Sequence, residues 1–318
     1  MLVAFALTVL ARRYALARQL IDAPGERRSH AVATPRGGGI AIVAVVLPAM
    51  LWLGTRGGGG QSICLLGAMG LALVAGIGWI DDHRPLSPWV RLAVHLVAAM
   101  LLAGGVAASG QPIWWSIVVC LLALGLVNVW NFMDGIDGLA STQLVLVALG
   151  FLLLGLRDEG ALLACIVVAA TLGFLPLNAP KARIFLGDVG SGALGYLAAC
   201  LIAFAPAPEV GVTALWLLPL SPFLIDAALT LLSRIIRGER WWTPHVQHMY
   251  QRCVQAGHAH VVVTSGYAVW AVLSILLAIS MAGAPQPVMI GAFATWYLFG
   301  VTIWLIFRVR HARRTRLS

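Results

Sequence analysis

Eleven apolar stretches dominate the sequence, and they constrain its fold more than any other feature. They span roughly residues 2–20, 38–53, 63–80, 90–108, 113–131, 139–156, 161–177, 190–205, 212–232, 262–282 and 288–307. A transmembrane helix needs about 20 mostly apolar residues. Only 10% of the residues are charged, against about 25% in soluble domains. The sequence therefore predicts an all-α, polytopic integral membrane protein with about 10–11 transmembrane helices.

The basic residues lie mostly in alternate loops between these stretches. The loops after the first, third, fifth, seventh and ninth stretches and the C-terminal tail, 308–318, hold 16 of the 21 Lys and Arg residues, counting Arg91. The opposite loops hold only Arg56 and Arg157. Because cytoplasmic loops are enriched in Lys and Arg, we expect the odd-numbered loops and the tail to be cytoplasmic and the N-terminus to lie outside. The formal net charge of +9 then reflects topology, and no nucleic-acid partner is expected.

The cysteines and the ends of the chain give little further information about the fold. The cysteines show no C-x-x-C spacing and four of the five lie in apolar stretches, so we expect buried thiols without a disulfide framework or a zinc site. No small-residue cleavage site follows the first stretch, so no cleavable signal peptide is expected. We interpret residues 1–318 as a single transmembrane catalytic domain that ends in the basic tail 308–318.

The segment from Asn128 to Leu139 concentrates polar residues where a predicted span ends. It contains two aspartates, two asparagines and two glycines between two apolar stretches. Ionisable side chains at such a place are expensive unless they meet water, an ion or a polar ligand, and glycines let the backbone come close to a bound group. A simple polar turn needs fewer such residues. The pattern therefore favours a functional site over a connecting turn.

Five aspartates fall in the predicted cytoplasmic loops, each close to the end of a span: Asp81, Asp82, Asp134, Asp137 and Asp188. Carboxylates that converge on one membrane face repel one another unless a cation neutralises them. Mg²⁺ favours one or two carboxylates plus substrate phosphates, so the pattern indicates a divalent metal with a phosphorylated ligand. The alternative is a solvated acidic face, which usually mixes Lys with Glu. These acids stand instead beside Gly, Asn and aromatic residues.

Other polar segments carry weaker signals. Arg36 precedes three glycines at the start of an apolar stretch, which suits an anion facing backbone N–H groups, although a flexible hinge explains the pattern equally well. His245 and His248 have the spacing of a helical metal pair, but the glutamate of a zinc protease is missing. The adjacent Trp241 and Trp242 are expected to anchor the membrane interface.

Asp226 differs from the other acids because it lies inside the ninth apolar stretch. An ionisable residue within a span is functional by default. A hydrogen bond that packs two helices is the alternative.

Three motifs together resemble the polyprenyl-phosphate N-acetylhexosamine-1-phosphate transferases. They are Asp81-Asp82, the run from Asn131 to Leu139 (N-F-M-D-G-I-D-G-L), and the run from Phe185 to Ser191 (F-L-G-D-V-G-S). The resemblance extends from about Leu20 to His260. That superfamily, glycosyltransferase family 4, includes the phospho-MurNAc-pentapeptide transferases and the GlcNAc-1-phosphate transferases.

The resemblance implies a reaction at the cytoplasmic face of the bacterial inner (plasma) membrane. A polyprenyl (undecaprenyl) phosphate attacks the β-phosphorus of a UDP-N-acetylhexosamine, giving lipid-diphosphate-sugar and UMP with Mg²⁺, or Mn²⁺ as an alternative. The membrane itself, the UDP-sugar and the lipid phosphate are thus the implied partners. Monomer and homodimer both stay open, as do direct attack and an aspartyl-phosphate intermediate.

The resemblance also implies roles for individual residues. Asp188 matches the metal-binding aspartate, and Asp81 and Asp82 match a pair that handles the lipid phosphate, one as a candidate general base. The matches to the nucleotide and metal site are Asn131, Asp134, Asp137, Asn178 and Phe185, the last as the aromatic ring that stacks on uracil. His245 and His248 loosely match a histidine motif. On physical grounds, Arg36 or Lys181 is expected to stabilise the leaving UMP.

Two departures separate the chain from the muramyl branch. That branch carries a Lys shortly before its Thr-Pro-x-x-Gly-Gly motif, whereas this chain reads Val32-Ala33-Thr34-Pro35-Arg36, and the adjacent histidines of that branch are replaced by His245-Val-Gln-His248. Both regions look more like the O-antigen-initiating branch. That branch uses UDP-sugars of N-acetylfucosamine, N-acetylquinovosamine or GlcNAc. We therefore expect a role in O-antigen or related cell-surface polysaccharide synthesis.

Two other functional classes remain as alternatives. A membrane prenyltransferase with two aspartate-rich motifs would also use Mg²⁺, but here Asp81 and Asp82 stand without a third acid. A transporter would place its ionisable residues near mid-membrane at broken helices, whereas these cluster at one membrane face.

Overall fold

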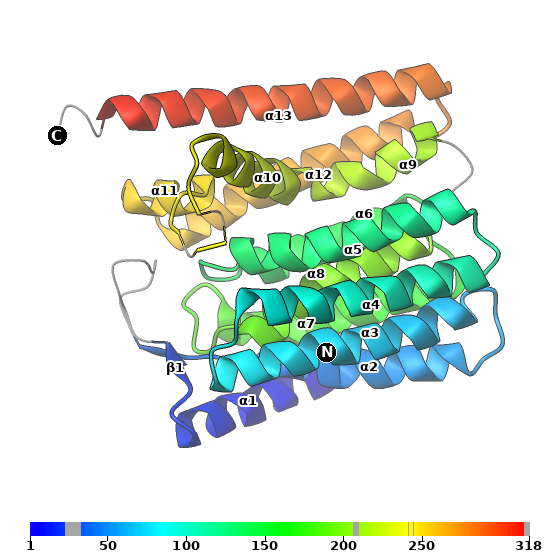
Figure 1. Cartoon of the computed structure of the whole chain (residues 1–318), viewed down its shortest axis with the longest axis horizontal. Helices are drawn as coiled ribbons and strands as arrows, with labels where there is room; N and C mark the ends of the chain where they lie inside the picture. The colour runs from blue at the N-terminus through cyan, green and yellow to red at the C-terminus, as the bar shows by residue number, and fades with distance from the viewer. Residues whose placement is uncertain (23–32, 206–209, 241, 244, 315–318) are drawn as a thin grey trace.

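All eleven apolar stretches form helices in a computed structural model, which describes residues 1–22, 33–205, 210–240, 242–243 and 245–314. Helices α1 to α8 are α1 (Leu2–Ala17), α2 (Ile40–Gly54), α3 (Gln61–His83), α4 (Pro88–Ala108), α5 (Ile113–Met133), α6 (Leu139–Leu153), α7 (Asp158–Asn178) and α8 (Asp188–Ala203). The later helices are α9 (Val210–Leu217), α10 (Ser221–Ile236), α11 (Met249–Gln255), α12 (His260–Met281) and α13 (Gln286–Arg314). The long helices run side by side, with α13 along one edge of the bundle (Figure 1).

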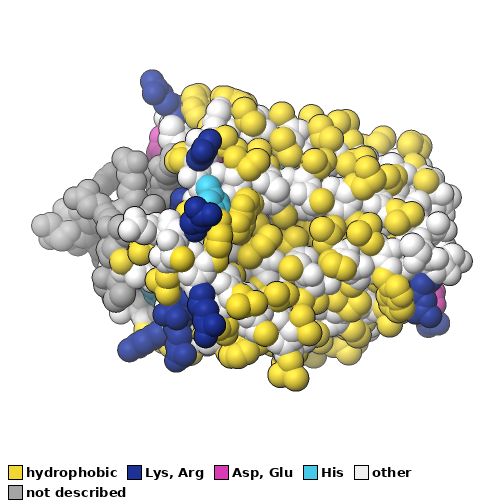
Figure 2. Space-filling model, turned by 90° about the horizontal axis from the view of Figure 1, so that it is seen from below, with side chains coloured by type: hydrophobic (Ala, Val, Ile, Leu, Met, Phe, Trp, Pro, Cys, Tyr) yellow, Lys and Arg dark blue, Asp and Glu magenta, His cyan; other side chains and the backbone are white. Residues whose placement is uncertain are grey.

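Among the described residues, seven helical stretches are long and apolar enough to cross a membrane, including the combined stretch Gly211–Ile236. Three shorter apolar helices, α2, α6 and α8, accompany them. Helix α1 belongs to neither group, since Arg12 and Arg13 interrupt its apolar surface. Hydrophobic side chains cover the middle of the face in Figure 2, and Lys and Arg gather at its ends. The prediction of an all-α, multi-pass membrane protein is confirmed.

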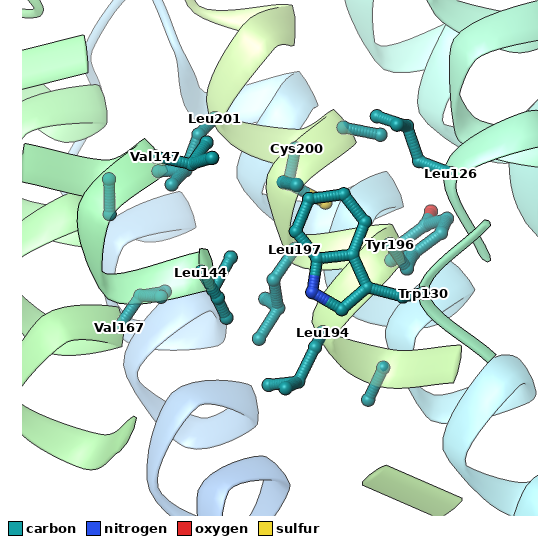
Figure 3. Close-up of a cluster of buried hydrophobic side chains, with 14 of the residues drawn as sticks. Leu126, Trp130, Leu144, Val147, Val167, Leu194, Tyr196, Leu197, Cys200 and Leu201 are labelled. Carbon is teal, nitrogen blue, oxygen red and sulfur yellow. The ribbon is translucent and has the colours of Figure 1, made fainter. Parts of the chain in front are cut away.

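Helix α8 lies at the centre of the bundle. Every residue from Val189 to Ala203 is buried, and Figure 3 shows side chains of this helix packed with Trp130 of α5 and Leu144 of α6. A Cβ added to Gly195 would collide with the backbone of Leu126. Small residues let membrane helices approach this closely. The first residue of α8, Asp188, is thereby fixed relative to α3 and α5.

The ninth stretch, expected as one span over 212–232, is broken. A 3₁₀ turn, η1 (Leu218–Leu220), separates α9 from α10 and contains Pro219, whose ring removes a backbone donor. Gln143 donates from Nε2 to the Pro219 carbonyl at 3.0 Å, and the Tyr297 hydroxyl donates to the Leu217 carbonyl at 2.9 Å. Irregular backbone at membrane depth needs such internal partners.

The helix ends that carry Asp82, Asp134 and Asp188 lie at one end of the bundle, which we call the loop end. Helices α3 and α5 finish there and α8 begins there, beside a two-residue antiparallel pairing of β1 (Ile21–Asp22) with β2 (Thr34–Pro35) (Figure 1). Helix α13 also ends there. Val32, Trp241 and residues 315–318 of the tail, all named above from the sequence, lie outside the described residues.

Candidate active site

A cavity of about 470 Å³ opens at the loop end, where the three sequence motifs meet. Ligand pockets for small molecules are commonly about 300–1,000 Å³. Nine of the residues singled out from the sequence line it: Arg36, Asp82, Asn131, Asp134, Asn178, Phe185, Asp188, His245 and His248. Three others, Asp81, Asp137 and Lys181, do not line this cavity.

Asp82 ties the end of α3 to the beginning of α8. Its carboxylate accepts hydrogen bonds from the backbone N–H groups of Asp188 and Val189, both at 3.1 Å. The first N–H groups of a helix have no partner within it and favour negative charge, so Asp82 caps α8 from another helix. Arg36 adds a 2.7 Å hydrogen bond from Nη2 to the backbone carbonyl of Asp82. Both carboxylate oxygens of Asp82 are thus engaged by protein donors.

Arg91 links the other acid of the pair to α8, and it was not recognised as a site residue from the sequence. Its Nη1 lies 2.7 Å from Asp81 Oδ2 and 3.4 Å from Asp188 Oδ1. Asp81 Oδ1 accepts a 2.6 Å hydrogen bond from the Leu86 N–H. Arg91 entered the sequence argument only as a marker of topology. A guanidinium in the first turn of an apolar helix is energetically costly unless it has a partner. That cost was the signal by which Arg91 could have been recognised from the sequence.

Asn131 orients the Asp188 carboxylate. Its Nδ2 donates to Asp188 Oδ1 and, at 3.0 Å, to the Ser191 hydroxyl. Asn131 sits in the last turn of α5 and Ser191 in the first turn of α8. The amide therefore joins the central polar segment to the third motif, while the Asp188 side chain keeps 26% of its surface exposed.

Asp134, the residue that follows α5, lines the same cavity with a free carboxylate. Among the described residues, no side chain or backbone group is within hydrogen-bond or ion-pair distance of it. Burial, followed by the charges of Asp188 and Asp82, raises the pKa of Asp134 to about 8. Carboxylates this close ionise together only when positive charge is supplied.

These acids suit a divalent cation that a substrate helps to hold. Asp134 and Asp188 face the cavity, and Mg²⁺ is commonly bound through one or two carboxylates plus phosphate oxygens. The described residues contain no group of three His, Cys, Asp or Glu side chains that would enclose a metal by themselves. An open two-carboxylate site is the arrangement that leaves room for phosphate.

Asp137 has turned away from the cavity. Its Oδ2 accepts a 3.2 Å hydrogen bond from the Ala182 N–H, and its Oδ1 lies 3.3 Å from His260 Nδ1. The Thr264 hydroxyl donates to the Asp137 carbonyl at 3.1 Å. Asp137 therefore joins the central polar segment to α12 and to the loop before α8. Lys181, beside Ala182, is exposed.

The glycines that follow Arg36 allow two backbone segments to lie close together. The N–H groups of Gly38 and Gly39 donate to the carbonyls of Phe185 and Leu186, both at 2.9 Å. These two N–H groups are therefore used within the protein and are not available to an anion. A Cβ on Gly39 would collide with the backbone of Gly190, so this glycine lets the start of α2 lie against α8.

Phe185 reaches the cavity from a turn that Asn178 holds in place. Asn178, the last residue of α7, is 3% exposed, donates to the Ile184 carbonyl at 3.2 Å and accepts from the Ser141 hydroxyl at 3.3 Å. The Phe185 N–H donates to the Pro35 carbonyl at 2.8 Å. The hydrogen bonds of Asn178 thus support the turn that carries the aromatic ring.

The two histidines reach the cavity from irregular backbone before α11, so the interpretation of a helical metal pair is wrong. Their ring centroids are 4.8 Å apart. His248 precedes the first residue of α11, and its ring stacks on that of Phe132 at 6.0 Å. His248 Nδ1 lies 3.8 Å from Asp226 Oδ1.

Asp226 holds α11 in position, which agrees with the packing alternative for this acid. It is 1% exposed and accepts hydrogen bonds from the Met249 N–H at 2.8 Å and the Tyr267 hydroxyl at 2.7 Å. The buried charge is compensated by these donors and by the nearby His248. Asp226 thus holds in place the segment that carries the two histidines.

Comparison with known proteins agrees with this geometry. The family model for glycosyl transferase family 4 matches residues 64–205, a range that includes Asp82, Asp134 and Asp188. The chain is 33% identical to a decaprenyl-phosphate N-acetylglucosaminephosphotransferase of Mycobacterium tuberculosis, over 74% of this chain and 69% of the relative. It is 33% identical to a phospho-N-acetylmuramoyl-pentapeptide-transferase of Deinococcus radiodurans, over 64% and 69%. A probable undecaprenyl-phosphate N-acetylglucosaminyl 1-phosphate transferase of Bacillus subtilis is 28% identical, over 80% and 75%.

Proposed function

This chain belongs to glycosyl transferase family 4, and we propose that it transfers an N-acetylhexosamine 1-phosphate from a UDP-sugar to a polyprenyl phosphate, releasing UMP. The observation that carries the proposal is the cavity at the end of a membrane bundle that Asp134, Asp188 and Arg91 line together. An amphiphilic acceptor needs a site at that boundary. The names of the relatives combine a polyprenyl phosphate with an N-acetylglucosamine phosphate group.

The reaction requires one phosphorus–oxygen bond to form and one to break. A phosphate oxygen of the lipid attacks the β-phosphorus of the UDP-sugar, and the bond from that phosphorus to the bridging oxygen breaks. UMP leaves with the electron pair. Phosphoryl transfer depends mainly on positioning and on neutralising charge. We assign the positioning of the diphosphate to Arg91 and Arg36, because both guanidinium groups line the cavity.

Asp134 and Asp188 would hold a Mg²⁺ ion, with Mn²⁺ as the alternative, since these carboxylates face the cavity and Asp134 lacks a partner among the described residues. A divalent cation there supplies charge neutralisation for the diphosphate. Asn131 keeps the Asp188 carboxylate oriented toward the cavity. Asn131 therefore acts as a positioning residue in the proposal.

Phe185 is proposed to stack on uracil. It lines the cavity on a turn held by Asn178, and aromatic rings bind bases through their faces. His245 and His248 line the same cavity, where their ring nitrogens can donate to phosphate oxygens. Lys181 is exposed and does not line the cavity. It can therefore act on a bound phosphate only through its charge at longer range.

We propose that Asp81 and Asp82 position Arg91 and the first residues of α8. All four of their carboxylate oxygens are near protein donors: Leu86 N–H, Arg91, and the N–H groups of Asp188 and Val189. A phosphate monoester has its second pKa near about 6, so much of the acceptor is already a dianion at neutral pH. The reaction therefore needs little help from a general base.

We place this reaction at the cytoplasmic face of a bacterial plasma membrane, at the start of O-antigen or related surface-polysaccharide synthesis. The concentration of basic residues in alternate loops supports that orientation. The phospho-MurNAc-pentapeptide substrate is the second candidate, and the relative from Deinococcus radiodurans favours it.

A panel of donors separates these substrates and the rival classes. The purified protein is incubated with polyprenyl phosphate, Mg²⁺ and either UDP-GlcNAc, its C4 or C6 variants, or UDP-MurNAc-pentapeptide, and UMP is measured. We expect UMP with a UDP-N-acetylhexosamine and none with the pentapeptide donor. UMP from the pentapeptide donor alone would support the second candidate. No UMP from any donor would support a prenyltransferase or a transporter.

A further inference from the structure

A second cavity, of about 300 Å³, lies between α10, α12 and α13. Its walls are almost entirely apolar and include Ile225, Met249, Val263, Gly266 and Trp304. Helix α11 separates it from the first cavity, because Met249 lines the second cavity and the next residue, Tyr250, lines the first. Asp226, which holds α11 in position, also lines this second cavity.

Three arginines stand on the elements that border this cavity, and we call them the basic rim: Arg237 at the end of α10, Arg252 on α11 and Arg308 on α13. The Arg308 guanidinium lies over the ring of Trp304, 4.8 Å from its centroid, and that ring lines the cavity. Helix α13 packs against both α10 and α11. The rim therefore brings three like charges from α11, α13 and the end of α10 together.

The protein compensates this charge only in part. Glu239 is shared, lying 3.1 Å from Arg234 Nε and 3.0 Å from Arg237 Nη2. Within the described ranges, no carboxylate lies within ion-pair distance of Arg252 or Arg308. Burial and then the charge of Arg237 lower the pKa of Arg252. An additional anion would relieve this repulsion.

We propose that the basic rim and the second cavity bind an anionic glycerophospholipid of the surrounding bilayer. The headgroup phosphate lies among the guanidinium groups, which suit phosphate oxygens, and one acyl chain enters the apolar cavity. Basic pockets between transmembrane helices commonly bind lipid headgroups in this way. Leu305 and Ile306, next to Trp304 on α13, are exposed on the bundle surface, so the site adjoins the bilayer.

The proposed lipid lies directly behind α11. Met249 contacts the lipid cavity on one side, while His248 lines the first cavity on the other. A lipid that fills this space supports α11 and the histidines before it. The inference rests on the membrane bundle alone, and it stands whether or not the proposed transferase activity is found.

Native mass spectrometry of the full-length, delipidated protein tests the site. The protein is titrated in detergent with phosphatidylglycerol or phosphatidylcholine, and bound lipid is counted. We expect tighter binding of phosphatidylglycerol, reduced about five-fold for each guanidinium removed in Arg252→Gln and Arg308→Gln. Arg56→Gln is the matched control, because Arg56 lies over Trp52 at 4.6 Å in the same geometry at the opposite end.

A second variant pair probes the cavity without changing charge. Gly266 lines it and a Cβ there meets no atom within 4 Å, so Gly266→Leu is expected to place a side chain in the cavity. Gly291→Leu, equally unhindered on α13 but outside the cavity, is its control. We expect Gly266→Leu to lower phosphatidylglycerol binding and Gly291→Leu to leave it unchanged. If the arginine variants fail to fold, the comparison of Gly266→Leu with Gly291→Leu still tests the proposed lipid site.

Three results would overturn the inference. The first is equal binding of the two lipids by the wild-type protein. The second is unchanged phosphatidylglycerol binding in Gly266→Leu or in folded arginine variants. The third is stoichiometric displacement of phosphatidylglycerol by polyprenyl phosphate, which would assign the site to the acceptor.

Discussion

The carboxylate of Asp82 accepts a 3.1 Å hydrogen bond from the backbone N–H of Asp188, across 106 residues of sequence. This contact fixes the end of α3 to the beginning of α8, the most deeply buried helix of the bundle. Asp188 also contacts Arg91 and Asn131. One residue thus unites α3, α4, α5 and α8.

Removing the charge of the proposed metal ligands should raise the Mg²⁺ requirement. Asp134→Asn and Asp188→Asn keep the side-chain shape but lose the charge that holds the cation, so activity should fall and recover partly at high Mg²⁺. The measurement is the rate of UMP release against Mg²⁺ concentration. Asp158→Asn, at the opposite end of the bundle, should behave like the wild type. Full activity of both variants at low Mg²⁺ would refute this assignment.

Arg91→Gln should lower kcat. The change removes the 2.7 Å charge-assisted contact to Asp81 and the 3.4 Å contact to Asp188. Hydrogen bonds to charged groups are worth about 1.5–3 kcal/mol, which corresponds to about a 10–150-fold loss. Arg91→Lys keeps the charge without the fork of donors and should recover only part of the rate. Wild-type kinetics in Arg91→Gln, measured at saturating donor, would show that the site does not need this residue.

Much of this arrangement was predictable from the sequence. The apolar stretches predicted the helices because each is long enough to need the bilayer, and the acids at span ends predicted a common polar face. The break at Leu218–Leu220 was missed because the flanking residues are uniformly apolar and only Pro219 and Pro222 mark it.

Side-chain direction was the part that the sequence could not provide. Asp134 and Asp137 belong to one motif, yet Asp134 faces the cavity and Asp137 contacts His260 on α12. The difference comes from a turn with Gly138 in the left-handed region, φ 70°, and from a helix more than a hundred residues away in the chain. Arg91 was missed for a similar reason, because its partners come from two different helices.

Phe185→Ala should raise KM for the UDP-sugar. Stacking of an aromatic ring on a base is worth about 1–3 kcal/mol, a factor of about five to 150. The comparison is donor KM at saturating acceptor, with Phe299→Ala as the control because that ring is 53% exposed on α13. An unchanged donor KM would return Phe185 to a packing role.

Asp226→Asn should loosen α11 and the histidines before it. The new amide keeps only one acceptor oxygen, so either the Met249 N–H or the Tyr267 hydroxyl loses its acceptor, and the buried negative charge is lost. Tyr267→Phe is the matched partner, since it removes only the 2.7 Å hydrogen bond, worth about 1.5–3 kcal/mol. Thermal unfolding and donor KM should both shift more in Asp226→Asn than in Tyr267→Phe. If Asp226→Asn matched the wild type in both measurements, the role of Asp226 in holding α11 would be excluded.

The most direct measurement is UMP release from UDP-GlcNAc by the purified wild-type protein, with and without polyprenyl phosphate, beside the Asp188→Asn variant. We predict UMP only when both substrates and Mg²⁺ are present, an equal amount of polyprenyl-diphosphate-sugar, and strongly reduced product with Asp188→Asn. UMP formed equally well without the lipid, or by Asp188→Asn at the wild-type rate and Mg²⁺ concentration, would contradict the proposed transfer at this site.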